Sequence, residues 1–404
     1  MWDSIERMKY RLGPQTRTCR YGLVLGGGGA RASYQAGVLQ FMADALPHVD
    51  LSIVTGVSAG SLNAAYISND LRGFAAAVHN LVNTWENLTS EDVYETTSGF
   101  QLFWNVLRKT GAEDSGEIIP RYGLVHTDPL RSFLSKSLGA PDGVLTGIRK
   151  NIQDGKLDAC AFITTNYATG QTVAWTDGRE LQNWDRPDRV SHHGELTVDH
   201  IMASSSLPFL FPAIQLGDTW FGDGGIRMAD PLSPAVHLGA DRIFAISTRY
   251  GRSRREADEP LVTGYPPAAQ IFGLLLNAIF LDRLDQDAAL LERMNELLRS
   301  IPQRKRHGLR QIDLMVMRPS VDLGKLSREF EADLGGILKL IGIALGSKDT
   351  KSPDWLSMIL FEPEYSTRLI EIGYEDAKQE RDSLQRFFDP SLIWAKSKGA
   401  NKKG

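Results

Sequence analysis

Two glycine-containing turns, each between a short apolar segment and a helical segment, constrain the fold of this chain most strongly. The first turn, GGGGARA, follows YGLVL (21–25), and the second, SAGS, ends the stretch LSIVTGVSAGS (51–61). Short apolar segments bounded by such turns are typical of strands buried on both faces. The repeated order of strand, turn and helix predicts an α/β fold with a mostly parallel central sheet that helices cover.

The rest of the chain continues this pattern up to about residue 250 and then becomes richer in helical segments. Further strands are expected at 159–178 (two strands), 214–225 (a hairpin) and 241–248. Beyond residue 250, helical spacing is found at 267–299, 328–346, 353–361 and 364–387, with one more strand near 311–317. The expected organisation is an N-terminal lead-in (1–18), a catalytic domain (19–250), a helix-rich region packed on it (251–395) and a basic tail (396–404).

Composition narrows the possible functions. The 404 residues carry a net charge of −4, so no broad basic field for nucleic acid is expected. The two cysteines, Cys19 and Cys160, are interpreted as reduced thiols, and no cluster has the spacing of metal ligands. No segment resembles a signal peptide or a membrane span of about 20 apolar residues. The expected location is cytoplasmic or peripheral at a membrane, and the oligomeric state is left open.

The two most apolar segments, 271–280 and 334–346, are too short to cross a membrane. Two interpretations remain open for them. Each can be a helix packed in the core or a helix that contacts a membrane surface.

The second turn predicts a nucleophile. Gly56, Ser58 and Gly60 form a G-x-S-x-G pattern directly after a buried strand and before a helix. In this context the pattern is typical of a nucleophile elbow, in which a sharp turn lifts the serine hydroxyl above the carboxyl end of the sheet. Small neighbours allow the strand and helix to approach closely, and the helix N-terminus adds a positive field.

A serine hydroxyl needs a base, and the sequence offers a carboxylate more readily than a histidine. None of the eight histidines lies in a recognisable triad signature. Asp223 lies at a tight glycine turn, where an ordinary β-turn is the competing interpretation. Because a carboxylate is a weak base for an alcohol, such a dyad needs strong stabilisation of the oxyanion. Consecutive amides at Gly26–Gly29 can supply it.

The same glycine run does not fit a nucleotide site. A dinucleotide fingerprint that starts at Gly26 or Gly27 would end on Arg31 or Ala32, where glycine is required. A P-loop needs Gly-Lys-Ser/Thr, and this turn contains no lysine. An anion that forms during a reaction therefore explains the run better than a phosphate that binds.

Four blocks in this order resemble the patatin-like phospholipases. GGGGARASYQAGVL (26–39) is similar to the family's oxyanion block, and GVSAGS (56–61) to its nucleophile block. ASSSLPFLFP (203–212) is similar to its serine–proline–phenylalanine block, and DGG (223–225) to its Asp-Gly-Gly/Ala block. The resemblance covers about residues 20–250. Each block alone is common, but their combination is specific.

The resemblance implies a three-layer α/β/α fold and the activity of an acyl-ester hydrolase that needs no cofactor or metal. Ser58 would be the nucleophile and Asp223 the base, with phospholipid or lysophospholipid as substrate and transient contact with a membrane surface. The remaining positions form the implied oxyanion hole (Gly27, Gly28, Gly29 and Arg31) and support the two motifs (Gly56, Gly60, Gly224 and Gly225).

One position departs from the family pattern. The family places glycine after the basic residue, whereas Ala32 follows Arg31 here. Since alanine disfavours a positive φ, the amides of Gly27–Gly29 are expected to form the hole rather than any group at Ala32. The alternatives left open are a histidine triad, an acyltransferase or thioesterase that uses the same dyad, and a non-catalytic regulator.

Overall fold

The structure is a computed structural model of the chain. It describes residues 19–96, 125–179, 181, 184–258, 265–266, 268–333 and 354–389. The predicted lead-in, the basic tail and the apolar segment 334–346 lie outside the described residues.

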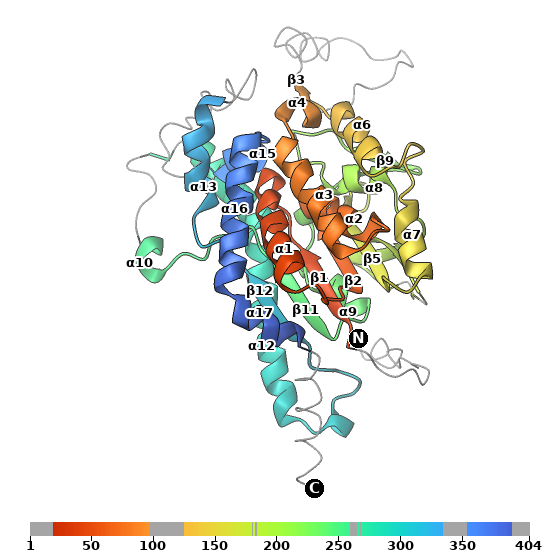
Figure 1. Cartoon of the computed structure of the whole chain (residues 1–404). Helices are drawn as coiled ribbons and strands as arrows, with labels where there is room; N and C mark the ends of the chain where they lie inside the picture. Colours follow the sequence, from red (N-terminus) through yellow and green to blue (C-terminus); the bar gives the residue numbers. More distant parts are fainter. Residues whose placement is uncertain are drawn as a thin grey trace.

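In the described part of the chain, ten strands form one sheet at the centre of the molecule (Figure 1). The strand order is β12-β11-β1-β2-β5-β6-β8-β7, and β10 pairs with both β5 and β9. The strands are β1 (Tyr21–Leu25), β2 (Ile53–Val57), β5 (Ala159–Asn166), β6 (Thr172–Gly178), β7 (Asp185–Arg186), β8 (Arg189–His193), β9 (Ile214–Leu216), β10 (Thr219–Asp223), β11 (Arg242–Ile246) and β12 (Asp313–Met317). A separate pair joins β3 (Glu95–Thr96) to β4 (Val125–His126).

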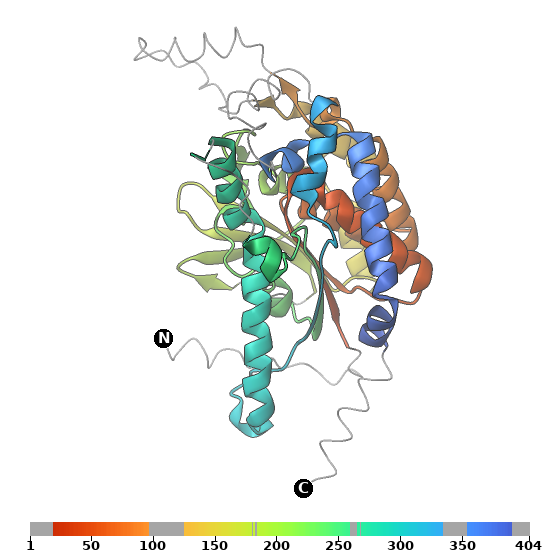
Figure 2. The ribbon, with the colours of Figure 1, turned by 90° about the vertical axis from the view of Figure 1, so that its left-hand side faces the viewer.

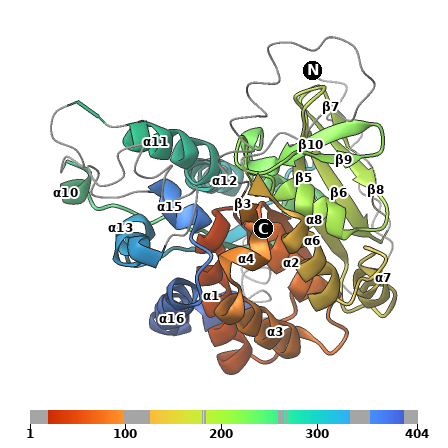
Figure 3. The ribbon, with the colours of Figure 1, turned by 90° about the horizontal axis from the view of Figure 1, so that it is seen from above.

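The five strands from β12 to β5 are mutually parallel, and β6 pairs antiparallel with β5. The side chains of β11, β1, β2 and β5 are buried on both faces, whereas those of the edge strand β12 are mostly half-buried. In β1, Leu23 and Leu25 join one hydrophobic cluster, while Val24 joins the cluster on the opposite face. The predicted three-layer α/β/α fold with a mostly parallel sheet is therefore confirmed, and Figure 3 shows the helices on both sides.

The described α-helices come from several parts of the chain, including its C-terminal part. They are α1 (Ser33–Ala45), α2 (Ala59–Asn69), α3 (Phe74–Asn87), α4 (Ser90–Val93), α6 (Asp128–Ser137), α7 (Thr146–Gln153), α8 (Val198–Ser204), α9 (Ser233–His237), α10 (Arg254–Ala257), α11 (Ala268–Phe280), α12 (Asp282–Ser300), α13 (Leu323–Leu326), α15 (Asp354–Ile359), α16 (Pro363–Gln379) and α17 (Arg381–Phe388). Short 3-10 helices are η1 (Gly29–Ala32), η3 (Gly224–Ile226), η4 (Gln303–Lys305) and η5 (Ser327–Asp333).

The C-terminal helix α16 packs directly on α1, the helix that follows the first glycine turn (Figure 1). Two glycines permit this close approach. A Cβ on Gly37 would overlap the carbonyl of Ile370, and one on Gly373 would overlap the carbonyl of Tyr34. Residues near the C-terminus thus share one core with the turn, since Tyr365, Leu369 and α1 belong to the same hydrophobic cluster.

The structure differs from the sequence-based expectation in two details. The helical segment expected at 267–299 forms two helices, α11 and α12, which meet at Leu281. The short strands β7 and β8 were not predicted, because the segment Asp185–His193 is rich in charged residues and lacks an apolar run. None of the described helices is both long and apolar enough to cross a bilayer.

Candidate active site

Ser58 lies in the turn between β2 and α2, with φ 56° and ψ −136°. A non-glycine residue at positive φ is strained, and the surrounding contacts must hold it there. Its N–H donates to Oγ of Ser204 at 3.0 Å, and that hydroxyl donates to the carbonyl of Ile163 at 2.6 Å. Its own carbonyl accepts from the hydroxyl of Ser61 at 2.6 Å. The predicted nucleophile therefore occupies a strained and firmly held turn.

Gly56 and Gly60 provide the close approach that this turn needs. A Cβ on Gly56 would overlap the carbonyl oxygen of Gly60 in the next helix. A Cβ on Gly60 would overlap the carbonyl of Leu25, at the end of the neighbouring strand β1. Helix α2 can therefore begin directly beside the carboxyl ends of β1 and β2.

Strand pairing along β5 brings Asp223 to Ser58. Ile163 pairs with Val57, the residue before Ser58, and the next residue, Thr164, pairs with Asp223. Strand β6 occupies the other edge of β5, so β2 and β10 lie end to end on one edge. Two motifs separated by more than 160 residues in the chain are thus placed side by side.

Asp223 is fully buried, and its partners hold the carboxyl group in one orientation. Oδ1 accepts from the N–H of Gly225 at 2.8 Å, and the main-chain carbonyl accepts from the hydroxyl of Thr165 at 2.8 Å. Gly224 lies against the carbonyl of Ile163, where a Cβ would overlap it. Oδ2 accepts no hydrogen bond of ordinary geometry from the described residues.

Burial raises the pKa of Asp223 to about 7, while the hydroxyl of Ser58 and the N–H of Gly225 oppose the rise by favouring the carboxylate. The Ser58 hydroxyl is therefore close enough to act on the carboxyl group, without a formed hydrogen bond to Oδ2. Catalytic hydrogen bonds are often loose before substrate binds. A carboxyl group with this pKa is a much better proton acceptor at neutral pH than an ordinary aspartate.

The first glycine turn lies directly beside the serine. A Cβ on Gly27 would be 2.9 Å from Cβ of Ser58. Gly28 and Gly29 have φ of 142° and 57°, conformations that favour glycine. Among the described residues, the N–H groups of Gly27, Gly28 and Gly29 donate to no protein acceptor. They are therefore free to donate hydrogen bonds to another group.

Thr248, at the end of β11, orients this turn. Its hydroxyl donates to the carbonyl of Gly27 at 2.7 Å. In a trans peptide the C=O and the following N–H point in opposite directions. Holding the carbonyl of Gly27 on Thr248 therefore turns the N–H of Gly28 away from β11.

Arg31 and Ala32 complete the first glycine turn. The guanidinium of Arg31 is buried and pairs with Oδ1 of Asp354 at 2.8 Å, so its charge is engaged by α15. Ala32 has φ −67° and ψ −13°, a right-handed helical conformation that alanine adopts readily. The turn does not need glycine at position 32.

Several residues that hold the site were not identified as site residues from the sequence, namely Thr165, Thr248, Asp354 and Ser357, and Ser204 was included only as part of the block 203–212. Hydroxyl groups and a lone aspartate carry no pattern that marks them in a sequence. Two histidines with altered pKa have packing roles. Burial lowers the pKa of His200 and of His237 to about 4, and their rings lie on Trp175 and Trp184.

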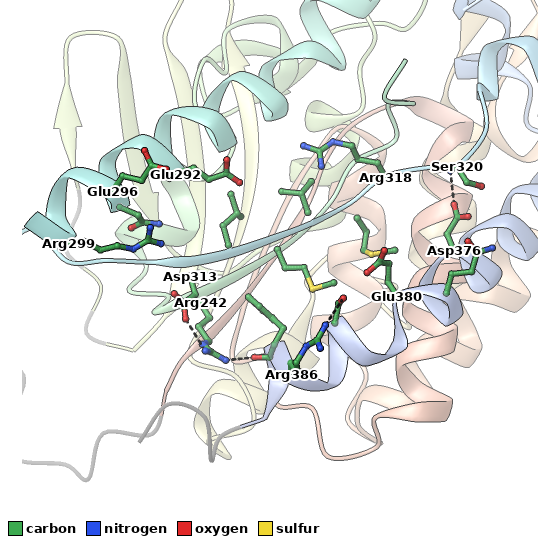
Figure 4. A pocket seen from close by; sticks show the side chains of 18 residues that line it. Arg242, Glu292, Glu296, Arg299, Asp313, Arg318, Ser320, Asp376, Glu380 and Arg386 are labelled. Carbon is green, nitrogen blue, oxygen red and sulfur yellow. Dashed lines mark hydrogen bonds and ion pairs between the residues drawn. The ribbon is translucent and has the colours of Figure 1, made fainter. Parts of the chain in front are cut away.

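A separate cavity of about 1130 Å³ opens along β12, between α12 and the helices α16 and α17 (Figure 4). Arg242, Glu292 and Asp376 are among its lining residues. Neither Ser58, Asp223 nor the first glycine turn lines it. We therefore do not include this cavity in the candidate active site.

The sequence model of the Patatin family, described as patatin-like phospholipase, matches residues 23–236. No curated protein matches the sequence significantly. Similar solved structures include VipD from Legionella pneumophila, at 14% identity and TM-score 0.36, covering 91% of this chain and 67% of that one. They also include human GIVD cytosolic phospholipase A2, at 12% identity and TM-score 0.45, covering 97% of this chain and 62% of that one.

This chain thus spans less than two thirds of the human structure's length. The family match, in contrast, covers more than half of this chain and includes the nucleophile turn, the glycine turn and Asp223. The chain belongs to the patatin-like phospholipase family.

Proposed function

We propose that the protein is a serine acyl hydrolase in which Ser58 is the nucleophile and Asp223 the general base. One observation carries the proposal: consecutive residues of β5 pair with Val57 and Asp223, which places the strained Ser58 turn beside a buried carboxyl group. The raised pKa of Asp223 and the free amides of the first glycine turn support it.

In the proposed reaction, Oγ of Ser58 attacks the ester carbonyl carbon while its proton passes to the carboxylate of Asp223. The N–H groups of Gly27, Gly28 and Gly29 stabilise the oxyanion of the tetrahedral intermediate. When the intermediate collapses, the C–O bond to the alcohol breaks and Asp223 returns the proton to the departing oxygen. Water then repeats the sequence on the acyl-enzyme, which releases the fatty acid and regenerates Ser58.

We further propose acyl esters of phospholipids or lysophospholipids as substrates, reached by transient contact with a membrane surface. Family membership supports a lipid ester. The uncharged helix α11 supports contact with lipid, because it follows the exposed Tyr265 and presents Ile271, Leu274 and Leu275 to solvent.

Release of free fatty acid from mixed phospholipid vesicles tests the proposal. We expect the wild-type protein to release fatty acid, and we expect Ser58→Ala and Asp223→Asn each to lower the rate at least about 1000-fold. Ser68→Ala is a matched control, because Ser68 is an equally buried serine in helix α2, the helix that follows Ser58. Equal release by wild type and Ser58→Ala would refute the assignment.

A further inference from the structure

Helix α15, which lies outside the family match, is packed against the glycine turn of the candidate active site. All six of its residues, Asp354–Ile359, are buried. Figure 3 shows α15 between α11 and the start of α1. Gly29 approaches α15 so closely that a Cβ on it would overlap the carbonyl of Met358. The position of this turn therefore depends on where α15 lies.

A buried ion pair joins the two segments. The guanidinium of Arg31 donates from Nη2 to Oδ1 of Asp354 at 2.8 Å and from Nε to Oγ of Ser357 at 2.6 Å. Arg31 is 3% exposed and Asp354 is 6% exposed. A charge buried to this extent is strongly unfavourable without its partner, so each residue constrains the position of the other.

Arg31 transmits this constraint to the glycines through the backbone. Its N–H donates to the carbonyl of Gly28 at 3.2 Å, which closes the turn that contains the free amides. Two residues separate Arg31 from Gly28, and Gly29 already touches α15. A shift of the guanidinium would therefore displace the free amides of the glycine turn.

Asp354 is itself oriented by a second element. Its Oδ2 accepts from Nδ2 of Asn277 in α11 at 2.7 Å, so the two carboxylate oxygens bind two different segments. Ser357 in turn donates its hydroxyl to the main-chain carbonyl of Asp354 at 2.6 Å. These hydrogen bonds fix the orientation of the Asp354 carboxylate toward Arg31.

We infer that Asp354 is a positioning residue for the oxyanion hole, acting through Arg31. This inference rests on the proposed function, and it assigns to the C-terminal region a direct part in setting the catalytic geometry. Its effect should fall on the chemical step, because oxyanion-hole donors act on the transition state more than on bound substrate.

The test uses the full chain and a soluble short-chain ester, with active sites counted by fluorophosphonate labelling run to completion. In Asp354→Asn, which keeps the shape of the side chain but removes its charge, we expect kcat per labelled site to fall about 10- to 100-fold, since displaced catalytic groups cost about this much. We expect KM to change by less than about threefold. Arg31→Lys, which keeps the charge, should retain more activity than Arg31→Gln.

Asp177→Asn is a matched control. Asp177 is a carboxylate of β6 with 1% exposure, and it pairs with Arg149 at 3.1 Å, away from the glycine turn. The same change of charge there should leave kcat per labelled site within about twofold of wild type.

Counting labelled sites separates a positioning role from a structural one. A purely structural role would lower the fraction of labelled protein while kcat per labelled site stays at the wild-type value, and that result would overturn the inference. Asp354→Ala, which removes the whole carboxyl group, can be measured in the same way. If that variant fails to fold, the isosteric Asp354→Asn still tests the inference. Wild-type protein that neither labels nor hydrolyses ester would refute the proposed function, and the inference would fall with it.

Discussion

At the scale of single residues, the burial of Asp223 has opposite consequences for catalysis and for stability. Burial disfavours the carboxylate and raises its pKa to about 7, against partial compensation from Ser58 and Gly225. A stronger base results, because proton affinity rises with pKa. Ionisation of this fully buried carboxyl group at neutral pH, however, lowers the stability of the folded state.

The pH dependence of activity follows from this pKa. We expect kcat/KM to rise about tenfold per pH unit up to pH 7 and to level off above it, because only the ionised carboxyl group can accept the Ser58 proton. Initial rates on a soluble ester between pH 5 and 9 measure this profile. A profile that is already flat from pH 5 would show that Asp223 is not the titrating base.

The same pKa predicts an effect on stability with a defined sign. Between pH 4 and 7 the folded state keeps a proton that the unfolded state has lost, since the ordinary pKa is 3.8. This contribution to stability is complete below about pH 4 and is lost as the pH rises through 7, by at most about 4 kcal/mol. Asp223→Asn should therefore unfold at a higher temperature than wild type at pH 8, with little difference at pH 4.

Residues with a local signature could be predicted from the sequence, and residues that act at a distance could not. Ser58 and Asp223 lie in turns whose glycines are visible in the sequence. The sequence could not show the backbone conformation of Ala32, which is a right-handed helical one that alanine adopts readily. Asp354 carries no local signature, since its role depends on a contact with Arg31, 323 residues away.

At the scale of elements, strands rich in apolar residues could be predicted from the sequence, including the edge strand β12, whereas the charged strands β7 and β8 could not. Strands β1, β2 and β11 are short, mostly apolar segments whose residues are all buried, as expected for strands covered on both faces. Strands β7 and β8 lie at one edge of the sheet and contain polar and charged residues, so their segment has no strand pattern.

Helix α11 combines an exposed apolar face with a connection to the site. Leu274 and Leu275 are 55% and 56% exposed, whereas Phe280 lies against Gly225, next to Asp223. The helix contains no charged residue over its 13 positions. Contact with a lipid surface would remove this apolar face from water, as in helices that lie in a membrane interface.

We expect the double substitution Leu274→Ser and Leu275→Ser to lower hydrolysis of phospholipid vesicles about tenfold or more, because less apolar surface would be buried in lipid. Hydrolysis of a soluble short-chain ester should stay close to wild type. Vesicle co-sedimentation and fatty-acid release on the same samples measure both effects.

Leu290 and Leu297 of α12 are the matched control, with exposures of 55% and 59%. Figure 2 shows α12 running from the α11 end of the molecule toward the opposite end. The double substitution Leu290→Ser and Leu297→Ser should leave the hydrolysis of phospholipid vesicles unchanged. An equal loss in the two pairs would show that α11 has no special contact with lipid.

At the scale of the whole molecule, the described part of the chain after residue 250 packs against the segment that carries the motifs. Strand β12 extends the central sheet beside β11, α16 packs on α1, and α15 contacts the glycine turn. We propose that the two sequence-defined regions, 19–250 and 251–395, act as one catalytic unit. The sequence indicated that the chain becomes richer in helical segments after about residue 250, but it could not show which surfaces these helices cover.

The most direct test of the account is the site of covalent labelling by a fluorophosphonate, mapped by mass spectrometry of the digested protein. We predict one adduct, on the peptide that contains Ser58, and no labelling in Ser58→Ala or when the wild-type protein is unfolded beforehand. Labelling of Asp223→Asn should be slower by at least about 100-fold, because the hydroxyl then lacks its base. An adduct on another residue, with Ser58 unmodified and ester hydrolysis intact, would contradict the account.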